Sequence, residues 1–237
     1  RKFLPQATYD GSYKSELDEN EKKIYQGLYD TFVTNRKPHT ETVVVRFSPK
    51  IEFPVVYSDV ENDAPDDRDL EDVTDMILSA AAAFFYDCPQ AFWIRSFAYS
   101  LYYTFSEGGD TGTVGRIDIE FDTDAYPNAY DDIAAFDAGI AEAVNIITQA
   151  RSNQSVYATL KAIHDYILLN ASYDYGALSG SVYTYGYAYT AAPLFTGKGT
   201  FVCEGYAKAF KILCDRFGIG CALVSGNGMT SASSGGP

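Results

Sequence analysis

One stretch near the end of the chain constrains its fold most, residues 199–219 with the sequence GTFVCEGYAKAFKILCDRFGI. A glycine-flanked loop leads to Cys203, and apolar residues then recur at the spacing of one helix face: Ala207, Phe210, Leu213, Cys214 and Phe217. This period predicts a helix that is buried on one side. Gly218 stands where a left-handed glycine commonly ends a helix. The stretch therefore predicts a cysteine in the first turn of a partly buried helix.

The start of a helix is a favourable place for thiol chemistry. Its first N–H groups have no partner inside the helix, and the helix dipole favours negative charge there. A helix N-terminus lowers the pKa of a thiol, and the thiolate is the nucleophile. The free N–H groups can also hold the oxyanion that forms when a thiolate attacks an acyl carbon. Cys203 is therefore a candidate catalytic nucleophile, and the alternative is a small buried hydrophobe, as many free cysteines are.

The neighbours of Cys203 carry two further expectations. Gly205 is expected to leave the surface beside the sulfur bare, so that a substrate backbone can approach. Glu204 and Lys208 stand four residues apart and are expected to pair on the far side of the helix.

The other cysteines and the histidines are interpreted as structural. Cys88, Cys214 and Cys221 lie in apolar surroundings, and the four cysteines follow neither a zinc pattern nor a disulfide framework. His164 stands beside Ile163 in the apolar period of a predicted helix. That position favours a hydrogen-bonded core histidine over a base for Cys203.

Several motifs together resemble the transglutaminase-like superfamily of bacteria. The nucleophile segment of that family reads C-x-G-Y-A on a helix, followed by G-I and by a strand that ends in V-x-G. The chain has matching residues in Cys203-Glu204-Gly205-Tyr206-Ala207, in Gly218-Ile219 and in Val224-Ser225-Gly226. Upstream, Ile163-His164-Asp165-Tyr166-Ile167 and Tyr173-Asp174-Tyr175 resemble the preceding part of the family, so the resemblance covers about residues 155–226.

The resemblance implies a papain-like fold with a Cys-His-Asp triad, in which Cys203 is the nucleophile. The family's His and Asp lie on strands after the V-x-G segment, and neither His39 nor His164 matches that position. The sequence ends at Pro237, so we expect only the front half of the core here, without the triad His and Asp, and little activity from this chain alone. One of Tyr183, Tyr185, Tyr187 and Tyr189 is expected to add a hydroxyl to the oxyanion hole.

The resemblance also implies a function. It predicts acyl transfer or amide hydrolysis through a Cys203 thioester on a protein or peptide substrate, with a cell-wall peptide among the candidates. It further implies a bacterial protein that is secreted or held at the cell surface. The alternative is a non-catalytic binding or adhesion module that keeps the fold, which the many tyrosines of residues 96–121 favour.

Charge divides the chain in two. The net charge is −14, and residues 1–150 carry 28 acidic and 12 basic side chains against 4 and 6 in residues 151–237. The acidity argues against nucleic acid as a partner, because phosphate binding needs clustered Lys and Arg. The asymmetry predicts an acidic N-terminal α+β module over 1–150 and the transglutaminase-like core over 151–237. The sequence contains no run of 18 or more apolar residues, so no membrane span is predicted.

No cofactor or metal is implied by any motif. A calcium site is the functional interpretation of the acidic stretch from Asp59 to Asp75, but EF-hand spacing is absent. A solvated loop followed by the acidic first turn of a helix is favoured.

The expected elements define an α+β fold. An irregular leader over 1–16 is followed by helices, strands and a loop that the patterns place as follows: a helix over 17–35, a strand over 42–47, a helix over 70–86, an antiparallel hairpin over 96–106 and 113–121, a helix over 131–150, a helix capped by Ser155, and a tyrosine-rich loop over 173–189. Trp93 is expected in the core.

Overall fold

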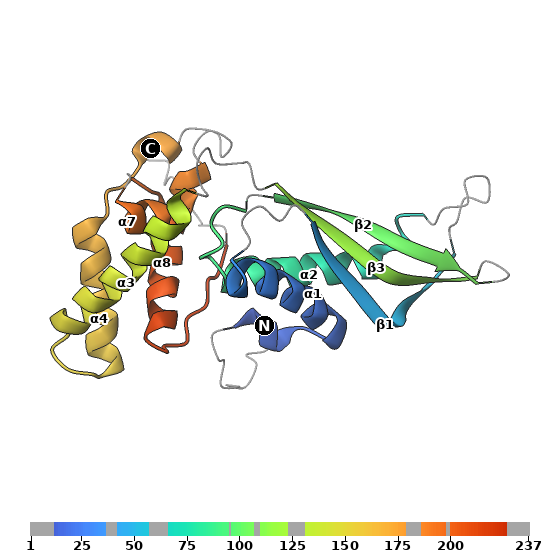
Figure 1. Cartoon of the computed structure of the whole chain (residues 1–237), viewed down its shortest axis with the longest axis horizontal. Helices are drawn as coiled ribbons and strands as arrows, with labels where there is room; N and C mark the ends of the chain where they lie inside the picture. Colours follow the sequence, from blue (N-terminus) through green and yellow to red (C-terminus); the bar gives the residue numbers. More distant parts are fainter. Residues whose placement is uncertain are drawn as a thin grey trace, which may run out of the picture.

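A computed structural model describes residues 12–36, 42–56, 66–94, 96–106, 110–122, 131–178, 186–197 and 200–226. Figure 1 shows an elongated molecule, with a three-stranded sheet and two helices at one end and a group of helices at the other. The mixture of helices with an antiparallel sheet confirms the predicted α+β class.

The first part of the chain contains these elements: η1 (Tyr13–Glu16), α1 (Glu19–Tyr29), the π-helical turn η2 (Asp30–Thr34), β1 (Thr42–Pro54), α2 (Glu71–Asp87), β2 (Ser96–Phe105) and β3 (Thr111–Asp122). The second part contains α3 (Asp132–Ala150), α4 (Val156–Asn170), α5 (Tyr175–Leu178), η3 (Gly186–Tyr189), α7 (Ala192–Thr196) and α8 (Cys203–Arg216).

The sheet has the strand order β1-β3-β2, and both pairs are antiparallel. The pairing of β2 with β3 confirms the predicted hairpin. β1 is longer than the predicted strand, because it continues past Pro49 to Pro54. Its register with β3 shifts between Arg46 and Ile51, and this irregularity accommodates the proline, which cannot donate to the ladder. η1 is also a correction, since an irregular leader was predicted over 1–16 and residues 13–16 of it form a 3-10 helix.

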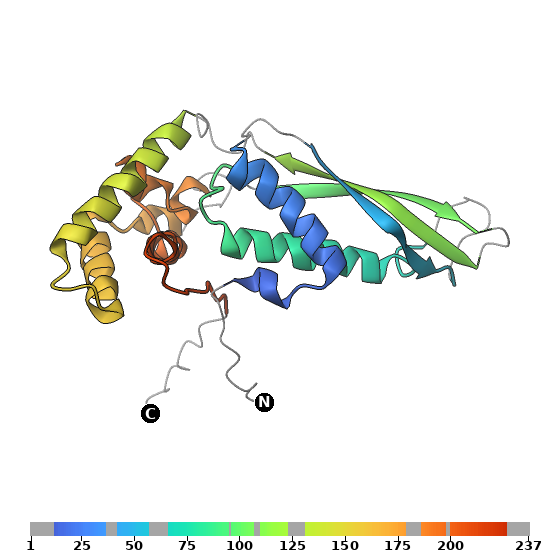
Figure 2. The same ribbon diagram turned by 60° about the horizontal axis from the view of Figure 1, so that its bottom comes forward.

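Helices α1 and α2 cover one face of the sheet (Figure 2). α1 begins at Asp18, which forms a capping box with Glu21. Phe32, which follows α1, lies 4.9 Å from Phe121 of β3 between ring centroids, at an edge-to-face angle. From β2, the Tyr99 hydroxyl donates to Thr74 of α2 at 3.2 Å. Buried apolar side chains between these layers form the core of the N-terminal part.

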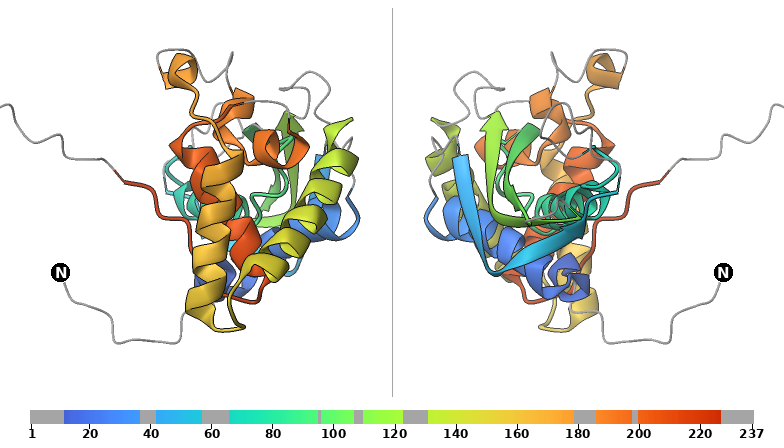
Figure 3. Two further views of the ribbon diagram at one scale, coloured as in Figure 1. Left: turned by 90° about the vertical axis from the view of Figure 1, so that its left-hand side faces the viewer. Right: turned by 90° about the vertical axis from the view of Figure 1, so that its right-hand side faces the viewer.

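The second part is a bundle in which α3 contacts α4, α7 and α8. The left view of Figure 3 shows α3 and α4 in front of α8. α3 confirms the helix predicted over 131–150, and Ser155 caps α4 by accepting the N–H of Ala158 at 3.2 Å. The domain boundary near residue 150 stays a prediction. Although α3 lies before that boundary in the sequence, it packs against α4, α7 and α8, which follow it.

A short segment after α2 joins the two parts. Its Phe92 ring lies 4.7 Å from Phe136 of α3 and 6.2 Å from Tyr187. Trp93 is fully buried beside it, as predicted. The apolar core is therefore continuous from the sheet to the helical bundle. Among the helices of the described ranges, none has both the length and the apolar composition that crossing a bilayer requires.

Candidate functional site

Helix α8 begins at Cys203, as the sequence predicts. Val202 is its N-cap residue and supplies no side-chain cap, and the first backbone bond within the helix is from Tyr206 N–H to the Val202 carbonyl. The N–H groups of the first turn are therefore left without a partner from the helix itself. Cys203 is exposed, so its sulfur stands at the open end of a helix that is otherwise packed into the bundle.

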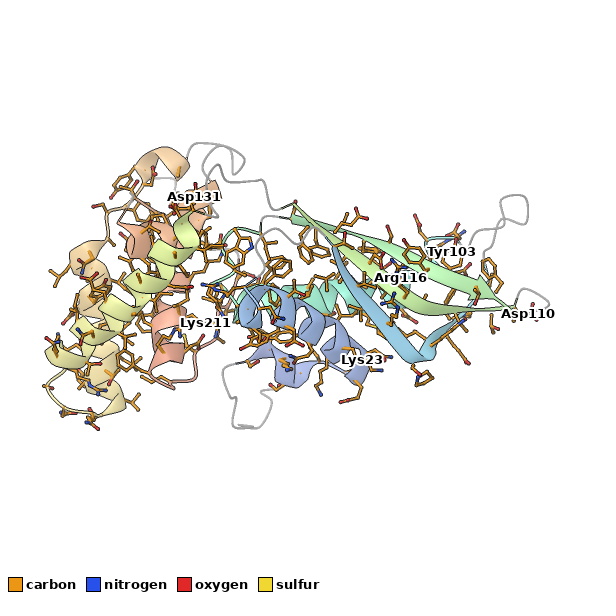
Figure 4. The ribbon with its side chains drawn as sticks, viewed as in Figure 1. Lys23, Tyr103, Asp110, Arg116, Asp131 and Lys211 are labelled. Carbon is orange, nitrogen blue, oxygen red and sulfur yellow. The ribbon has the colours of Figure 1, made fainter. Side chains whose placement is uncertain are left out.

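The far end of α8 also matches the prediction. Gly218 has φ +66°, its N–H donates to the Asp215 carbonyl at 3.1 Å, and the Ile219 N–H donates to the Cys214 carbonyl at 2.9 Å. This pair of bonds is a Schellman motif. The ammonium of Lys211, labelled in Figure 4, donates to Asp215 and, at 3.0 Å, to the Cys221 carbonyl. The segment after α8 is thereby turned back along the helix.

The buried face of α8 matches the predicted one only in part: Leu213 and Cys214 are buried, and Phe210 and Phe217 are half-buried against the core. It comprises Gly205, Ala209, Lys211, Ile212, Leu213 and Cys214. Ala207 is exposed instead of buried. The reason is its place one turn after Cys203, where both residues face the same groove.

Gly205 serves packing and does not open the surface to substrate. It is buried, and a Cβ there would lie 2.5 Å from the Thr190 carbonyl oxygen and 2.7 Å from the Phe201 ring. The expectation of a bare surface beside the sulfur was therefore wrong. The glycine instead lets the start of α8 approach the backbone of the preceding segment.

A tyrosine that sequence reasoning missed lies beside the cysteine. Partial burial raises the pKa of the Tyr173 hydroxyl, the nearby Cys203 thiol raises it further, and the Cys203 backbone N–H lowers it. The hydroxyl therefore stays protonated at neutral pH, close to the atom from which acyl chemistry would start.

Backbone pairing holds Tyr173 in place. Tyr173 forms a parallel bridge with Phe201, two residues before Cys203. The Phe201 N–H donates to the Ser172 carbonyl and the Asp174 N–H to the Phe201 carbonyl, each at 3.2 Å. The Tyr173 ring also lies 5.9 Å from that of Tyr206 on α8. The motif Tyr173-Asp174-Tyr175 was the signal in the sequence, but its partner lies about thirty residues away.

The tyrosines named as candidates for the oxyanion hole lie elsewhere. Tyr183 and Tyr185 are outside the described residues. The Tyr187 hydroxyl donates to Asp132 at 2.8 Å, and that of Tyr189 donates to the Ala177 carbonyl at 3.3 Å. Neither lines the groove that contains Cys203, and the tyrosine whose hydroxyl interacts with Cys203 is Tyr173.

Cys203 opens into a groove of about 870 Å³ between the two parts of the chain. From α2 and β2 come Leu78, Ala82, Phe85, Tyr86 and Phe97; from α8 and the segment after it come Cys203, Glu204, Ala207, Lys208, Leu223, Val224, Ser225 and Gly226. The N-terminal part thus supplies one whole wall of the site.

Glu204 and Lys208 form the predicted pair, at 2.6 Å, but not on the far side of the helix. Both line the groove beside Cys203, and the Lys208 ammonium also donates to the Tyr189 carbonyl at 3.1 Å. They also line a second pocket of about 330 Å³, which shares Phe85 with the groove. The Glu204–Lys208 pair therefore lies between the groove and the second pocket.

His164 is a surface residue, so the predicted core histidine was wrong. Its side chain is 61 % exposed, and its Nδ1 lies 3.2 Å from Asp165. The apolar period of α4 passes through Ile163 and Ile167 and leaves His164 on the outer face. The described lining of the groove contains no histidine. His39 is outside the described residues.

The other cysteines differ in their surroundings. Cys88 and Cys214 are buried, as predicted, and burial raises the pKa of the Cys88 thiol to about 12. Cys221 is only half-buried, which corrects its placement in the core. A hydrogen bond from Cys214 lowers the pKa of Cys221 to about 7, because it stabilises the thiolate.

The acidic stretch can be judged only in part, since 57–65 lie outside the described residues. Glu71 and Asp72 form the acidic first turn of α2, as predicted. Asp66 pairs with Arg68 at 2.7 Å. Within the described ranges, no three His, Cys, Asp or Glu side chains are grouped closely enough to hold a metal ion.

The fold and the site define a class of protein. An α+β chain in which an exposed cysteine begins a packed helix, open to a groove, has the arrangement of papain-like cysteine enzymes and related folds. Residues 143–235 match the family described as the transglutaminase-like superfamily. This matched region contains α4, α8 and Cys203, so the resemblance stated from the motifs is confirmed there. No curated protein matches the chain.

Proposed function

We propose that the chain performs thiol-dependent acyl chemistry on protein or peptide substrates, a cell-wall peptide among the candidates, with Cys203 as nucleophile. The observation that carries this proposal is an exposed cysteine at the uncapped start of α8, open to a groove. The transglutaminase-like match supports the same chemistry.

The proposed reaction has two steps. The Cys203 thiolate attacks the carbonyl carbon of a carboxamide, a C–S bond forms, and the C–N bond breaks as the leaving amine takes a proton from water. An amine or water then attacks the thioester and releases the thiol. In this proposal the N–H groups of Glu204 and Gly205, in the first turn of α8, donate to the oxygen that carries negative charge in each step.

The proposal assigns no base. The resemblance implies a histidine, and the titratable groups that accompany Cys203 in the described lining include Glu204, Lys208 and Tyr86 instead. The assignment therefore rests on Cys203 as nucleophile, with Tyr173 as the neighbouring hydroxyl whose pKa the thiol raises.

Acylation by an activated ester tests the nucleophile. The chain is incubated with p-nitrophenyl acetate, and each cysteine peptide is examined by mass spectrometry for one acetyl group that hydroxylamine removes. A Cys221→Ser background keeps the half-buried thiol of Cys221, whose pKa is lowered, out of the measurement. We expect acetylation at Cys203 and none in Cys203→Ala. A folded protein whose Cys203 never acquires the acetyl group would contradict the proposal.

That negative outcome would favour the alternative, a binding or adhesion module that keeps the fold without turnover. Location outside the cell or at the bacterial cell surface is a further part of the proposal, supported by the resemblance. Fractionation of the producing cells with an antibody to the chain tests it, and recovery in the cytosolic fraction alone would contradict it.

A further inference from the structure

We infer that the groove beside Cys203 takes a large apolar side chain of the acyl-donor peptide, and that the wall from α2 and β2 selects it. This inference rests on the proposed function and names its substrate class. The argument depends on the composition of that wall, on its position opposite the sulfur and on the charges around it.

Helix α2 has two apolar faces. Ile77, Ala80, Ala81 and Phe84 are buried in the core. Leu78, Ala82, Phe85 and Tyr86 form a second stripe at the spacing of one helix face, and all four line the groove. Leu78 is 46 % exposed and Ala82 is exposed too. The second stripe is therefore only partly buried in the core, and Leu78 and Ala82 remain open to the groove.

The stripe continues onto the sheet. Phe97 of β2 lies 6.1 Å from Phe85 in a stacked arrangement and lines the same groove. On the opposite side, Cys203 and Ala207 stand one turn apart on α8 and face these aromatic side chains across the groove. A substrate whose acyl carbon reaches the sulfur must therefore place its adjoining side chain near an apolar surface, and burying that surface is favourable.

The charges of the groove argue against a charged side chain. Glu204 and Lys208 are the charged residues of the described lining, and they neutralise each other at 2.6 Å. The Tyr86 and Ser225 hydroxyls bond to one another at 2.7 Å. A carboxylate or ammonium of the substrate would lose water here without gaining an opposite charge. The volume of about 870 Å³ lies in the range of sites that hold small ligands, so an aromatic or branched side chain fits.

Four chloromethyl ketones that differ only in their amino-acid side chain test this selection. The probes are N-blocked derivatives of phenylalanine, leucine, aspartate and lysine. Each reacts by attack of the sulfur on the methylene carbon, so that a C–S bond forms and chloride leaves. Rates at Cys203 are measured by peptide mass spectrometry in the Cys221→Ser background and divided by the rate with iodoacetamide, which has no side chain to select.

We expect the phenylalanine and leucine probes to react on the order of tenfold faster than the aspartate and lysine probes after this correction. Leu78→Asp should remove most of the preference, and Leu78→Ala should remove part of it while keeping a good helix former. Leu168→Asp is the matched control, because Leu168 is 57 % exposed on α4. Iodoacetamide rates should stay the same in all variants.

Each outcome decides the matter. Equal corrected rates for the four probes, or a preference that Leu78→Asp leaves intact, would overturn the inference while leaving Cys203 a reactive thiol. Failure of iodoacetamide to label Cys203 in the folded chain would instead overturn the proposed function, and the inference with it.

Discussion

Tyr13 and Tyr86 together hold the segment that follows α8. Their ring centroids lie 5.4 Å apart. The Tyr13 hydroxyl donates to the Leu223 carbonyl at 2.5 Å, and the Tyr86 hydroxyl bonds to Ser225 at 2.7 Å. η1 and α2 thus fix the chain at the rim of the groove that contains Cys203.

Removing the Tyr13 hydroxyl tests that contact. Tyr13→Phe loses one hydrogen bond but keeps the ring, so we expect the free energy of unfolding to fall by about 1 kcal/mol. Tyr157→Phe is the control, because Tyr157 is 77 % exposed. Urea denaturation followed by circular dichroism measures both variants. Equal stability of Tyr13→Phe and the unaltered chain would show that the bond contributes nothing.

Two helical glycines should respond oppositely to alanine. A Cβ on Gly139 would lie 1.8 Å from the Phe195 carbonyl oxygen, so α3 and α7 must separate, and we expect a loss of about 1–3 kcal/mol or more. A Cβ on Gly27 would meet Val45 at 3.4 Å, an ordinary contact, and helix propensity should contribute about 0.5–1 kcal/mol of stability. Thermal unfolding of both variants checks the contrast, which similar melting temperatures would refute.

The Tyr173 hydroxyl should matter for acylation. Tyr173→Phe removes the hydroxyl that interacts with the Cys203 thiol, so we expect acetylation of Cys203 by p-nitrophenyl acetate to slow by about tenfold or more. Tyr175→Phe is the matched control, since Tyr175 is 78 % exposed and its ring lies 5.1 Å from that of Tyr173. If the two variants react at the same rate, Tyr173 has no part in the chemistry.

Cys221 should titrate near neutral pH. Its pKa is lowered to about 7 by the hydrogen bond from Cys214, so its thiolate and its alkylation rate should increase through pH 7 and level off above it. Because the folded pKa lies below the ordinary thiol value, this stabilisation is present above that value and is lost as the pH falls through 7.

Alkylation by iodoacetamide at a series of pH values, measured for each cysteine peptide, checks this profile. Cys214→Ala should move the midpoint of Cys221 upward, since the donor is gone. Cys88, whose pKa is about 12, should stay slow throughout. A Cys221 midpoint that Cys214→Ala leaves unchanged would refute the assigned cause.

The sequence predicted well those elements whose formation depends on residues that are close together in the chain. The period of α8, its stop at Gly218 and the cap at Ser155 are each set within a few residues, and the structure contains all three. The hairpin of β2 and β3 is equally local, since its strands follow one another in the chain.

The missed features depend on partners distant in sequence. Nothing near Tyr173 indicates that Phe201 will pair with it. The surface beside Gly205 was expected to be bare because nothing in its own stretch indicates that the Thr190 carbonyl approaches it from the preceding segment. Ala207 fits an apolar period as well on an open face as on a buried one, and only the placement of α2 decides between them.

The groove is built from two parts of the chain, and the residues that would contact the substrate come from a different part than the residues proposed for the chemistry. Leu78 and Phe97 precede α3 in the sequence, whereas Cys203 and Tyr173 follow it. Exchange of the upstream part between related chains would therefore alter the surface that the substrate meets and leave the sulfur and its hydroxyl partner untouched. Such a chain can diversify in what it recognises by recombination, with its chemistry inherited intact.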